Sequence, residues 1–222
     1  MIIKPIWESK RGKGGFLKAL SPHPFHKILD VGCGNGSPYW YKEKYPNSYY
    51  VGLDIEDYNQ KGNVNLVANE YLKTSPNEFS KTIRSMKNQF DILISSHNIE
   101  HCNDPIDTFD AMIYALKPGG AAYLSTPSLS SLNFPSRKGS LNFYDDTSHK
   151  KPVDLLELTR LYRSAKQDEI EVIFYTKRYR PWILFFKGLL FEPISYLRKE
   201  SWDDGSTWAL YGFEQIVWIK KL

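Results

Sequence analysis

One short stretch of the chain, SSHNIEHCNDP (residues 95–105), carries a spacing that can bind metal. His97 and His101 are four residues apart, and Glu100 stands beside the second. On an α-helix this H-x-x-E-H spacing puts both imidazoles on one face, as in zinc hydrolases of the inverted zincin type. Here the stretch directly follows an apolar run, and a helix is expected to begin after Asp104. We therefore expect a loop without a metal ion, in which His101 ties the loop to neighbouring backbone.

A second candidate site is the glycine-rich stretch LDVGCGNGS, in which Gly32, Gly34 and Gly36 alternate after an apolar run. Glycine allows positive φ and close approach of a ligand to the backbone. The helix expected to start near Ser37 points its free amides and its positive dipole end at the same place. We expect the loop to receive a negatively charged group. The third glycine of the dinucleotide fingerprint G-x-G-x-x-G is missing, and no P-loop motif occurs.

The next apolar run ends in Asp54. A carboxylate at this point can accept hydrogen bonds from both hydroxyls of a nucleoside ribose. The simpler alternatives are a tight turn for the glycines and a surface acid for Asp54. The two signals in this order favour a ligand that contains a nucleoside.

The elements that must position these residues alternate along the chain. Strands are expected at residues 27–32, 48–55, 64–69, 90–96, 121–127, 169–179 and 211–222, and helices at 37–45, 76–89, 104–117 and 153–165. This alternation predicts an α/β fold with a Rossmann-like, doubly wound, mostly parallel sheet. In such a sheet the ligand binds at the carboxyl ends of the strands, where the motifs above fall.

The composition of the chain limits the number of domains, the kind of partner and the cellular location that can be expected. The 222 residues suit a single domain, and the excess of 29 Lys and Arg over 25 Asp and Glu is too small to indicate nucleic acid. Only two cysteines are present, so we expect no disulfide framework and a cytoplasmic location. The start of the chain lacks the apolar region of a signal peptide. An apolar segment near residues 181–197 is interrupted by charges and prolines and is too short for a confident membrane span.

These motifs together resemble the class I S-adenosylmethionine-dependent methyltransferases, in their small-molecule branch. D-x-G-x-G-x-G at residues 30–36, then Asp54, FDILISSHNIEH and LKPGGAAYLSTP follow in the expected order. The clear resemblance covers residues 27–127 and is specific because four separated motifs agree. It implies a seven-stranded sheet and an enzyme that uses S-adenosyl-L-methionine, with Glu-His after the fourth strand but without metal.

The resemblance also implies which residues hold the cofactor. The glycine loop would meet the methionyl group, Asp54 the ribose, and Ser96 and His97 the methionyl arm. Asn69 and Glu70 would follow the third strand near the adenine, where the family often has an Asp. The predicted cofactor-binding residues are Asp30, Gly32, Cys33, Gly34, Gly36, Asp54, Ile55, Asn69, Glu70, Ser96 and His97.

A candidate catalytic base lies in FYDDTSHKKP, after the fifth expected strand. Asp146 and His149 are similar to an Asp-x-x-His found in some sugar and small-molecule O-methyltransferases. Methyl transfer to a hydroxyl acceptor is faster when a base lies within hydrogen-bond distance of the hydroxyl. The alternative is that both residues order the loop or cap the next helix.

The leading interpretation is O-methylation of a small molecule, a sugar or a surface-glycan precursor, as in polysaccharide biosynthesis. Basic residues in SKRGKGG suit an anionic acceptor. The alternatives are an RNA or protein methyltransferase, and a non-catalytic S-adenosylmethionine-binding module. Nucleic acid is disfavoured because no long basic stripe or N-P-P-Y motif occurs. Within one domain of residues 1–222, we expect an N-terminal flap or tail (1–26) and a lid or homodimer contact (180–210).

Overall fold

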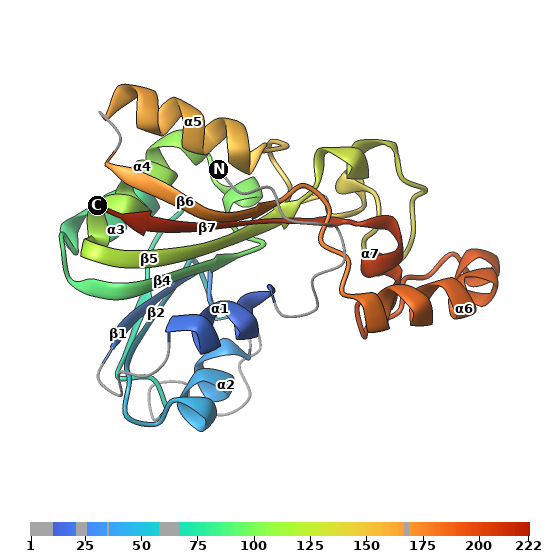
Figure 1. Cartoon of the computed structure of the whole chain (residues 1–222), viewed down its shortest axis with the longest axis horizontal. Coiled ribbons are helices and arrows are strands. Elements are labelled where there is room, and N and C mark those ends of the chain that lie inside the picture. Colours follow the sequence, from blue (N-terminus) through green and yellow to red (C-terminus); the bar gives the residue numbers. More distant parts are fainter. Residues whose placement is uncertain (1–10, 21–25, 35, 58–66, 167–168) are drawn as a thin grey trace.

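A seven-stranded sheet runs through the middle of the molecule (Figure 1). The computed structural model describes residues 11–20, 26–34, 36–57, 67–166 and 169–222. The strand order is β3-β2-β1-β4-β5-β7-β6, with β7 antiparallel to both of its neighbours and the other pairs parallel. The expected Rossmann-like, mostly parallel α/β sheet is thereby confirmed.

The secondary-structure elements follow the expected alternation closely. The strands are β1 (Lys27–Val31), β2 (Tyr49–Asp54), β3 (Glu70–Lys73), β4 (Phe90–Ser96), β5 (Leu116–Pro127), β6 (Ile170–Thr176) and β7 (Glu214–Lys221). The α-helices are α1 (Lys13–Leu20), α2 (Ser37–Lys44), α3 (Phe79–Ser85), α4 (Pro105–Ala115), α5 (Leu155–Ala165), α6 (Trp182–Arg198) and α7 (Ser206–Tyr211). Short 3-10 turns are η2 (Ile99–His101), η3 (Leu129–Asn133) and η4 (Phe143–Asp145). Asp104 caps α4 as expected, because its side chain accepts from the amides of Ile106 and Asp107.

The third strand lies later in the chain than expected. The expectation was residues 64–69, of which 64–66 fall outside the described residues, whereas β3 covers Glu70–Lys73. Its register pairs Glu70 with Val51 and Lys73 with Asp54. The carboxyl end of β3 is therefore at Lys73. This edge strand is only partly buried, so its polar sequence gave no strong apolar signal.

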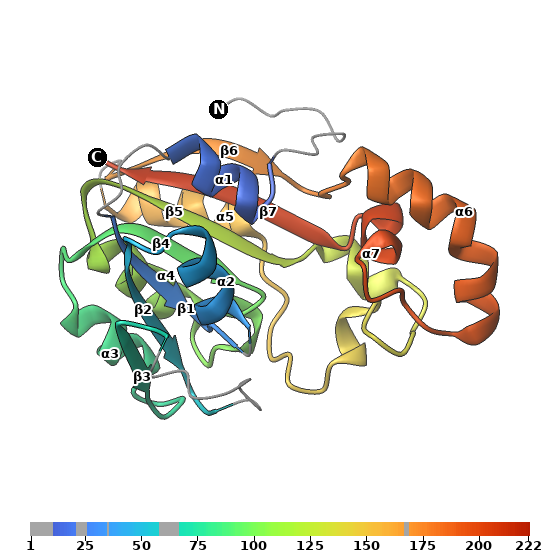
Figure 2. The same cartoon turned by 90° about the horizontal axis from the view of Figure 1, so that it is seen from below.

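Helices cover both faces of the sheet (Figure 2), and a hydrophobic cluster lies on each face. On one face, Phe16 of α1 and Tyr41 of α2 pack with Ile28 of β1. On the other face, α3, α4 and α5 contribute side chains such as Phe109, which pack with Leu29 of β1. Neighbouring residues of β1 thus serve opposite faces, as strand geometry requires. Burial on both faces holds the carboxyl ends of the strands in fixed positions.

The N-terminal segment is partly ordered against the sheet. Phe16 and Leu17 of α1 are 1% and 3% exposed. The Phe16 ring meets the edge of the Trp218 ring with the centroids 5.3 Å apart. Within residues 1–26, α1 is thus packed helix rather than tail, and residues 1–10 and 21–25 of the expected flap lie outside the described residues.

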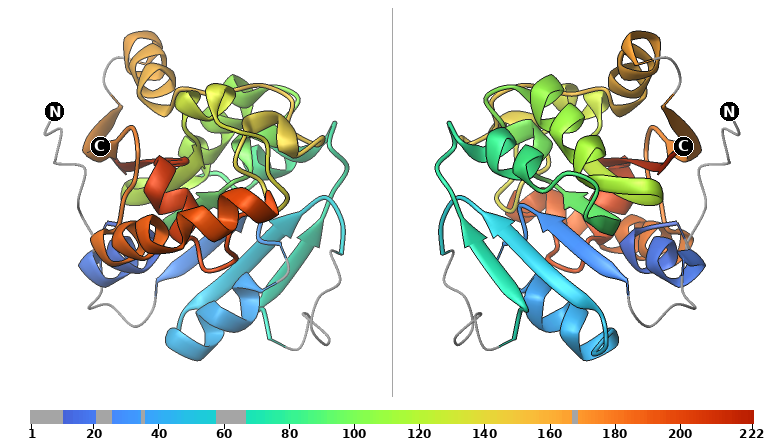
Figure 3. Two further views of the ribbon diagram at one scale, coloured as in Figure 1. Left: turned by 90° about the vertical axis from the view of Figure 1, so that its right-hand side faces the viewer. Right: turned by 90° about the vertical axis from the view of Figure 1, so that its left-hand side faces the viewer.

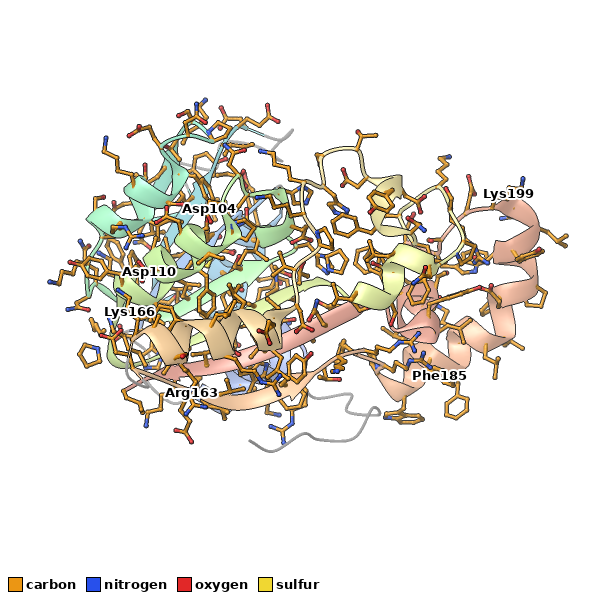
Figure 4. All side chains as sticks on the ribbon, turned by 90° about the horizontal axis from the view of Figure 1, so that it is seen from above. Asp104, Asp110, Arg163, Lys166, Phe185 and Lys199 are labelled. Atoms are coloured by element: carbon orange, nitrogen blue, oxygen red, sulfur yellow. The ribbon has the colours of Figure 1, made fainter. Side chains whose placement is uncertain are left out.

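Helices α6 and α7 lie between β6 and β7 in sequence and extend past one end of the sheet (Figure 1), so that α6 lies in front of the strands in the left-hand view of Figure 3. Figure 4 shows Phe185 on α6 and Lys199 directly after it, at the opposite end of the molecule from Asp110 and Lys166. Much of the outer surface of α6 is apolar, with Leu190 and other large side chains more than half exposed. Among the described residues, no helix is both long enough and apolar enough to cross a membrane. A role for this segment as a lid or a homodimer contact stays a prediction.

A buried arginine ties α6 to the loop after β5. Arg137 is 4% exposed and donates to both carboxylate oxygens of Glu192, at 3.0 and 2.6 Å. Arg137 also donates to Ser195 Oγ at 2.7 Å and to the Tyr211 hydroxyl at 3.2 Å. Such a bidentate pair fixes the orientation of both partners. The loop after β5 and the α6–α7 segment are therefore joined by one polar anchor.

We expect Arg137→Leu to lower the free energy of unfolding by on the order of 3 kcal/mol, because Glu192 then loses its charged partner. The neighbouring Lys138→Leu is a matched control, since Lys138 is 83% exposed and its pair with Glu200 contributes little. Urea unfolding of both variants measures the difference. Equal stability of the two variants would show that the Arg137 anchor does not hold α6.

Candidate functional site

A cavity of about 650 Å³ opens at the carboxyl ends of β1, β2 and β4 and reaches the first turns of α3 and α4. Its volume is within the range of small-molecule sites. In a doubly wound sheet, the point where the strand order reverses, here between β1 and β4, is the usual place for a ligand. The wall is formed by Gly32, Gly34, Asp54, Ile55, Pro76, Asn77, Phe79, Ser80, Lys81, His97, Asn98, His101, Cys102, Asn103, Asp104, Asp107, Thr108, Asp146, Ser148 and Lys150.

The glycine loop turns sharply where it borders this cavity. Gly32 and Gly34 have φ of 72° and 55°, in the left-handed region that favours glycine. A Cβ at Gly32 would lie 2.4 Å from Asn98 Oδ1, so the loop can pack against the β4–η2 loop only because this side chain is missing. A Cβ at Gly34 would meet nothing within 4 Å. Gly34 therefore leaves space for a ligand at the cavity wall.

Asp54 fixes the glycine loop and also lines the cavity. Its Oδ2 accepts from the Gly34 amide at 2.8 Å and its Oδ1 from the Ile55 amide at 2.7 Å. Burial raises the pKa of Asp54, and the two backbone donors oppose that rise. Each carboxylate oxygen can accept a further hydrogen bond. The side chain can thus bind two ligand hydroxyls while it keeps the loop in place.

Four other predicted cofactor-binding residues do not belong to the cavity wall. Asp30 is 2% exposed and accepts a hydrogen bond from the Tyr50 hydroxyl at 2.9 Å, and burial raises its pKa. Cys33 is 3% exposed. Ser96 Oγ lies 3.0 Å from Ser125 Oγ, and Gly36 is the N-cap of α2. These residues support the shape of the loop.

Asn69 and Glu70 lie at the amino end of β3, whereas the cavity lies at the carboxyl ends of the strands. This corrects their expected position. Asn69 Oδ1 accepts from the Tyr50 amide at 2.9 Å, and Glu70 accepts from the Tyr49 hydroxyl at 2.8 Å. The reason is the later start of β3, which puts both residues at its amino end.

The wall residues after β3 were missed by sequence reasoning. They are Pro76, Asn77, Phe79, Ser80 and Lys81. The rule that ligands meet the carboxyl ends of parallel strands would have identified them if the strand had been placed correctly.

His97 lines the cavity and is held between two carboxylates. Its Nδ1 lies 3.3 Å from Glu100 Oε1 and its Nε2 lies 3.4 Å from Glu214 Oε1. Burial lowers the pKa of His97, but the hydrogen bonds and charges of the two glutamates outweigh burial and raise the pKa to about 10. The ring also stacks on Phe213 with an interplanar angle of 9°. As an imidazolium, His97 joins the loop after β4 to the start of β7.

The H-x-x-E-H spacing does not lie on an α-helix. Between the two histidines the chain makes only the 3-10 turn η2, and His97 itself has φ of 51°. His97 contacts Glu214, whereas His101 contacts Ser148 at 3.0 Å. The expected loop is confirmed, and the two imidazoles serve different neighbours.

Four polar residues lie together beside the cavity and are here named the histidine cluster: His101, Asp146, Ser148 and His149. Ser148 Oγ donates to Asp146 Oδ1 at 2.5 Å and lies 3.0 Å from His101 Nδ1. His149 Nδ1 lies 2.5 Å from the carbonyl oxygen of Phe143, and His149 Nε2 lies 3.9 Å from Asp146 Oδ2. His101, Asp146 and Ser148 line the cavity, whereas the His149 side chain is 6% exposed and stands behind them. The predicted catalytic pair is thus brought together beside the cavity.

Comparison with known proteins identifies the family. A family model described as a methyltransferase domain matches residues 9–179. Ubiquinone biosynthesis O-methyltransferase of Saccharophagus degradans is 25% identical over 132 residues, which cover 56% of this chain and 53% of that protein. Phosphoethanolamine N-methyltransferase of Triticum aestivum is 30% identical over 118 residues, which cover 50% of this chain and 22% of that protein. The chain thus spans about half or less of the length of these curated relatives.

Solved structures agree on the fold. An S-adenosylmethionine-dependent methyltransferase from Archaeoglobus fulgidus aligns with a TM-score of 0.52 and 18% identity, over 88% of this chain and 86% of that one. Phosphoethanolamine N-methyltransferase 2 of Haemonchus contortus, in complex with phosphomonomethylethanolamine and S-adenosylhomocysteine, aligns with a TM-score of 0.57 and 20% identity. It covers 94% of this chain and 53% of that one. The chain therefore belongs to the methyltransferase domain family and is a class I S-adenosylmethionine-dependent methyltransferase domain.

Proposed function

We propose that the chain methylates a hydroxyl oxygen of a small-molecule or glycan-like acceptor. The observation that carries this proposal is one cavity that joins a glycine loop and Asp54 to the histidine cluster. The first part suits the cofactor, and the second offers groups that can take a proton from a hydroxyl. The curated relatives include both O- and N-methyltransferases by name. Oxygen is favoured here because an amine acceptor has less need of such groups.

The cavity fits S-adenosylmethionine. Gly34 leaves open space at the wall, where the methionyl group can lie against the backbone. Asp54 offers two carboxylate oxygens for the ribose hydroxyls, and Ile55, partly exposed nearby, offers an apolar surface for the adenine. When bound, S-adenosylmethionine supplies a methyl group on a positively charged sulfur, which is a good leaving group. His97 and the residues that support the loop would hold the wall in shape.

The protein's contribution to methyl transfer is mainly alignment. Bringing a hydroxyl and a methyl donor together in one cavity removes much of the entropic part of the barrier. We propose that Asp146, in the cavity wall, meets the acceptor and that His149 stands directly behind it. A base in this position typically contributes 10²- to 10⁴-fold, in order of magnitude, to the rate.

The acceptor class rests on two lysines of the cavity wall. Lys81 and Lys150 suit an anionic group, as a phosphorylated sugar or glycan precursor would carry, although the wall as a whole also holds four aspartates. Lys150 Nζ donates to Asn103 Oδ1 at 2.5 Å, which holds its ammonium near the cavity. The α6–α7 segment, anchored through Arg137 to the loop after β5, would cover the acceptor or contact a second copy. Two buried free cysteines suit a cytoplasmic location.

Calorimetry with S-adenosylhomocysteine tests the cofactor half of the proposal. We expect binding to the wild-type chain and a loss of roughly 10- to 100-fold in affinity for Asp54→Ala, because hydrogen bonds to a carboxylate are removed. Asp57→Ala is the matched control, since Asp57 is 54% exposed and pairs with Lys73 outside the cavity. Transfer of labelled methyl to hydroxyl acceptors tests the other half. Binding without transfer to any acceptor in a broad panel would instead support a non-catalytic module.

A further inference from the structure

We propose that Glu100, His101 and His149 form a binding site for a divalent transition-metal ion of the Zn²⁺ type, beside the cavity. Their ligand atoms lie within 4.8 Å of one another, although His149 is far from the other two in sequence. Glu100 and His101 come from η2, and His149 comes from the loop after η4. Glu100 and His101 of the H-x-x-E-H motif thus lie close to His149, whereas the motif itself suggests His97 as the third ligand.

The hydrogen bonds of the two histidines leave the Nε2 lone pairs free. The Phe143 carbonyl can only accept, so His149 Nδ1 must carry the proton that it shares with this oxygen. Ser148 Oγ gives its own proton to Asp146 Oδ1, so it accepts from His101 Nδ1. In both rings the unprotonated nitrogen is then Nε2. Metal-binding histidines are typically fixed in this way, by an oxygen that accepts from the second nitrogen.

Glu100 supplies the second, independent observation. It is fully buried, and apart from the His97 imidazolium neither of its carboxylate oxygens meets a hydrogen-bond donor among the described residues. Its ion pair with His97 involves Oε1, at 3.3 Å, and Oε2 has no hydrogen-bond partner among the described residues. A buried carboxylate with unused lone pairs is unfavourable unless a cation or donor meets it. A metal ion between Glu100 and the two imidazoles would satisfy it.

The ligand set selects the kind of ion. Two imidazoles and one carboxylate suit Zn²⁺ and its first-row neighbours, whereas Mg²⁺ and Ca²⁺ prefer oxygen ligands. Ligand atoms around tetrahedral zinc are about 3.4 Å apart, which follows from Zn–N distances of about 2.05 Å. From separations of up to 4.8 Å, the ligand atoms would thus need to close by up to about 1.4 Å. Asp146 Oδ2, 3.9 Å from His149 Nε2, lies beside the remaining coordination position.

This inference adds a metal ion to the proposed active site. Only the role of the ion in catalysis rests on the proposed function. His101 and Asp146 belong to the cavity wall, so an open coordination position would face an acceptor. A hydroxyl oxygen bound there would become more acidic and pass its proton to Asp146. The lone pair of His149 would then bind the ion and would not take the proton itself. Metal binding can be measured without any methyl transfer.

The test is equilibrium dialysis of the chelator-treated full chain against Zn²⁺, with Co²⁺ absorption in the visible range as a second readout. We expect about one ion per chain and a Co²⁺ spectrum with imidazole ligands. His149→Ala and His101→Ala should each weaken binding by at least about tenfold. His26→Ala, at the amino end of the sheet, is the matched control and should bind as the wild type does. Circular dichroism establishes that each variant is folded.

Two results would overturn the site: no stoichiometric Zn²⁺ on the wild-type chain, or unchanged binding in both folded histidine variants. A preference for Mg²⁺ over Zn²⁺ would overturn the assignment of imidazole ligands. If either variant is unfolded, Glu100→Gln and the Zn²⁺-dependent rise in melting temperature of the wild type replace it. Calorimetry with S-adenosylhomocysteine in the presence of a chelator keeps the two proposals apart. Cofactor binding without metal binding refutes this inference alone, and the reverse result refutes the proposed function alone.

Discussion

Gly34→Val should lower the affinity for S-adenosylhomocysteine by at least about 100-fold while the chain stays folded. Gly34 has φ of 55° and open space in front of it, at the wall of the cavity. A branched side chain there would occupy the space that we assign to the methionyl group. It would also strain the turn by roughly 1–3 kcal/mol, because β-branched residues rarely adopt positive φ. Domains of this size usually tolerate such a loss of stability.

Gly119→Val separates the two effects of that substitution. Gly119 also has positive φ, at 80°, and a Cβ there would meet nothing within 4 Å, but this residue does not border the cavity. We expect the Gly119 variant to lose stability to a similar degree and to keep its affinity. Calorimetry and thermal unfolding of both variants provide the measurements. Equal affinities for Gly34→Val and Gly119→Val would mean that the cofactor does not use the glycine loop.

His149→Ala should lower the turnover number by roughly 10²- to 10⁴-fold and leave the affinity for S-adenosylhomocysteine nearly unchanged. The reason is that His149 contacts the acceptor side of the site through Asp146 but does not itself line the cavity. The expected loss is the same whether its Nε2 accepts a proton or binds a metal ion. Turnover with labelled cofactor and the best hydroxyl acceptor measures the effect, and the dialysis experiment assigns the cause.

Lys151→Ala is the control for the His149 variant. Lys151 lies on the same loop, is exposed and is not part of the cavity wall. Its substitution should leave both turnover and affinity near wild-type values. A His149→Ala enzyme that turns over as fast as Lys151→Ala would remove His149 from the reaction.

The sequence predicts the part of the site that local signals determine. Gly32, Gly34 and Asp54 stand next to strong apolar runs, and an apolar strand ending in a glycine turn has few other ways to fold. Since the strands are parallel, their carboxyl ends meet at one edge, so the residue pattern alone is enough to place these three side by side. The fold follows from the same alternation.

The rest of the site depends on contacts that no local pattern records. β3 is a half-exposed edge strand, so EYLK lacks the apolar character that marks β1, β2 and β4, and Asn69 and Glu70 were placed at the wrong end of it. Glu100 and His149 meet only because the loop after β5 folds back, with the Lys150 amide donating to the Glu100 carbonyl at 2.9 Å. Such a contact between distant segments depends on the tertiary fold rather than on residue spacing.

The α6–α7 segment has an evolutionary consequence. The chain leaves the sheet at the end of β6 and returns at the start of β7, and Thr176 and Ile216 are neighbours in the register of these two strands. Because the two ends are held side by side, the entropy of closing the intervening stretch grows only slowly with its length. Relatives can lengthen, shorten or exchange this stretch and still form the same sheet. With the proposed role of this segment as a cover for the acceptor, acceptor preference can diverge within the family while the binding site for the methyl donor stays the same.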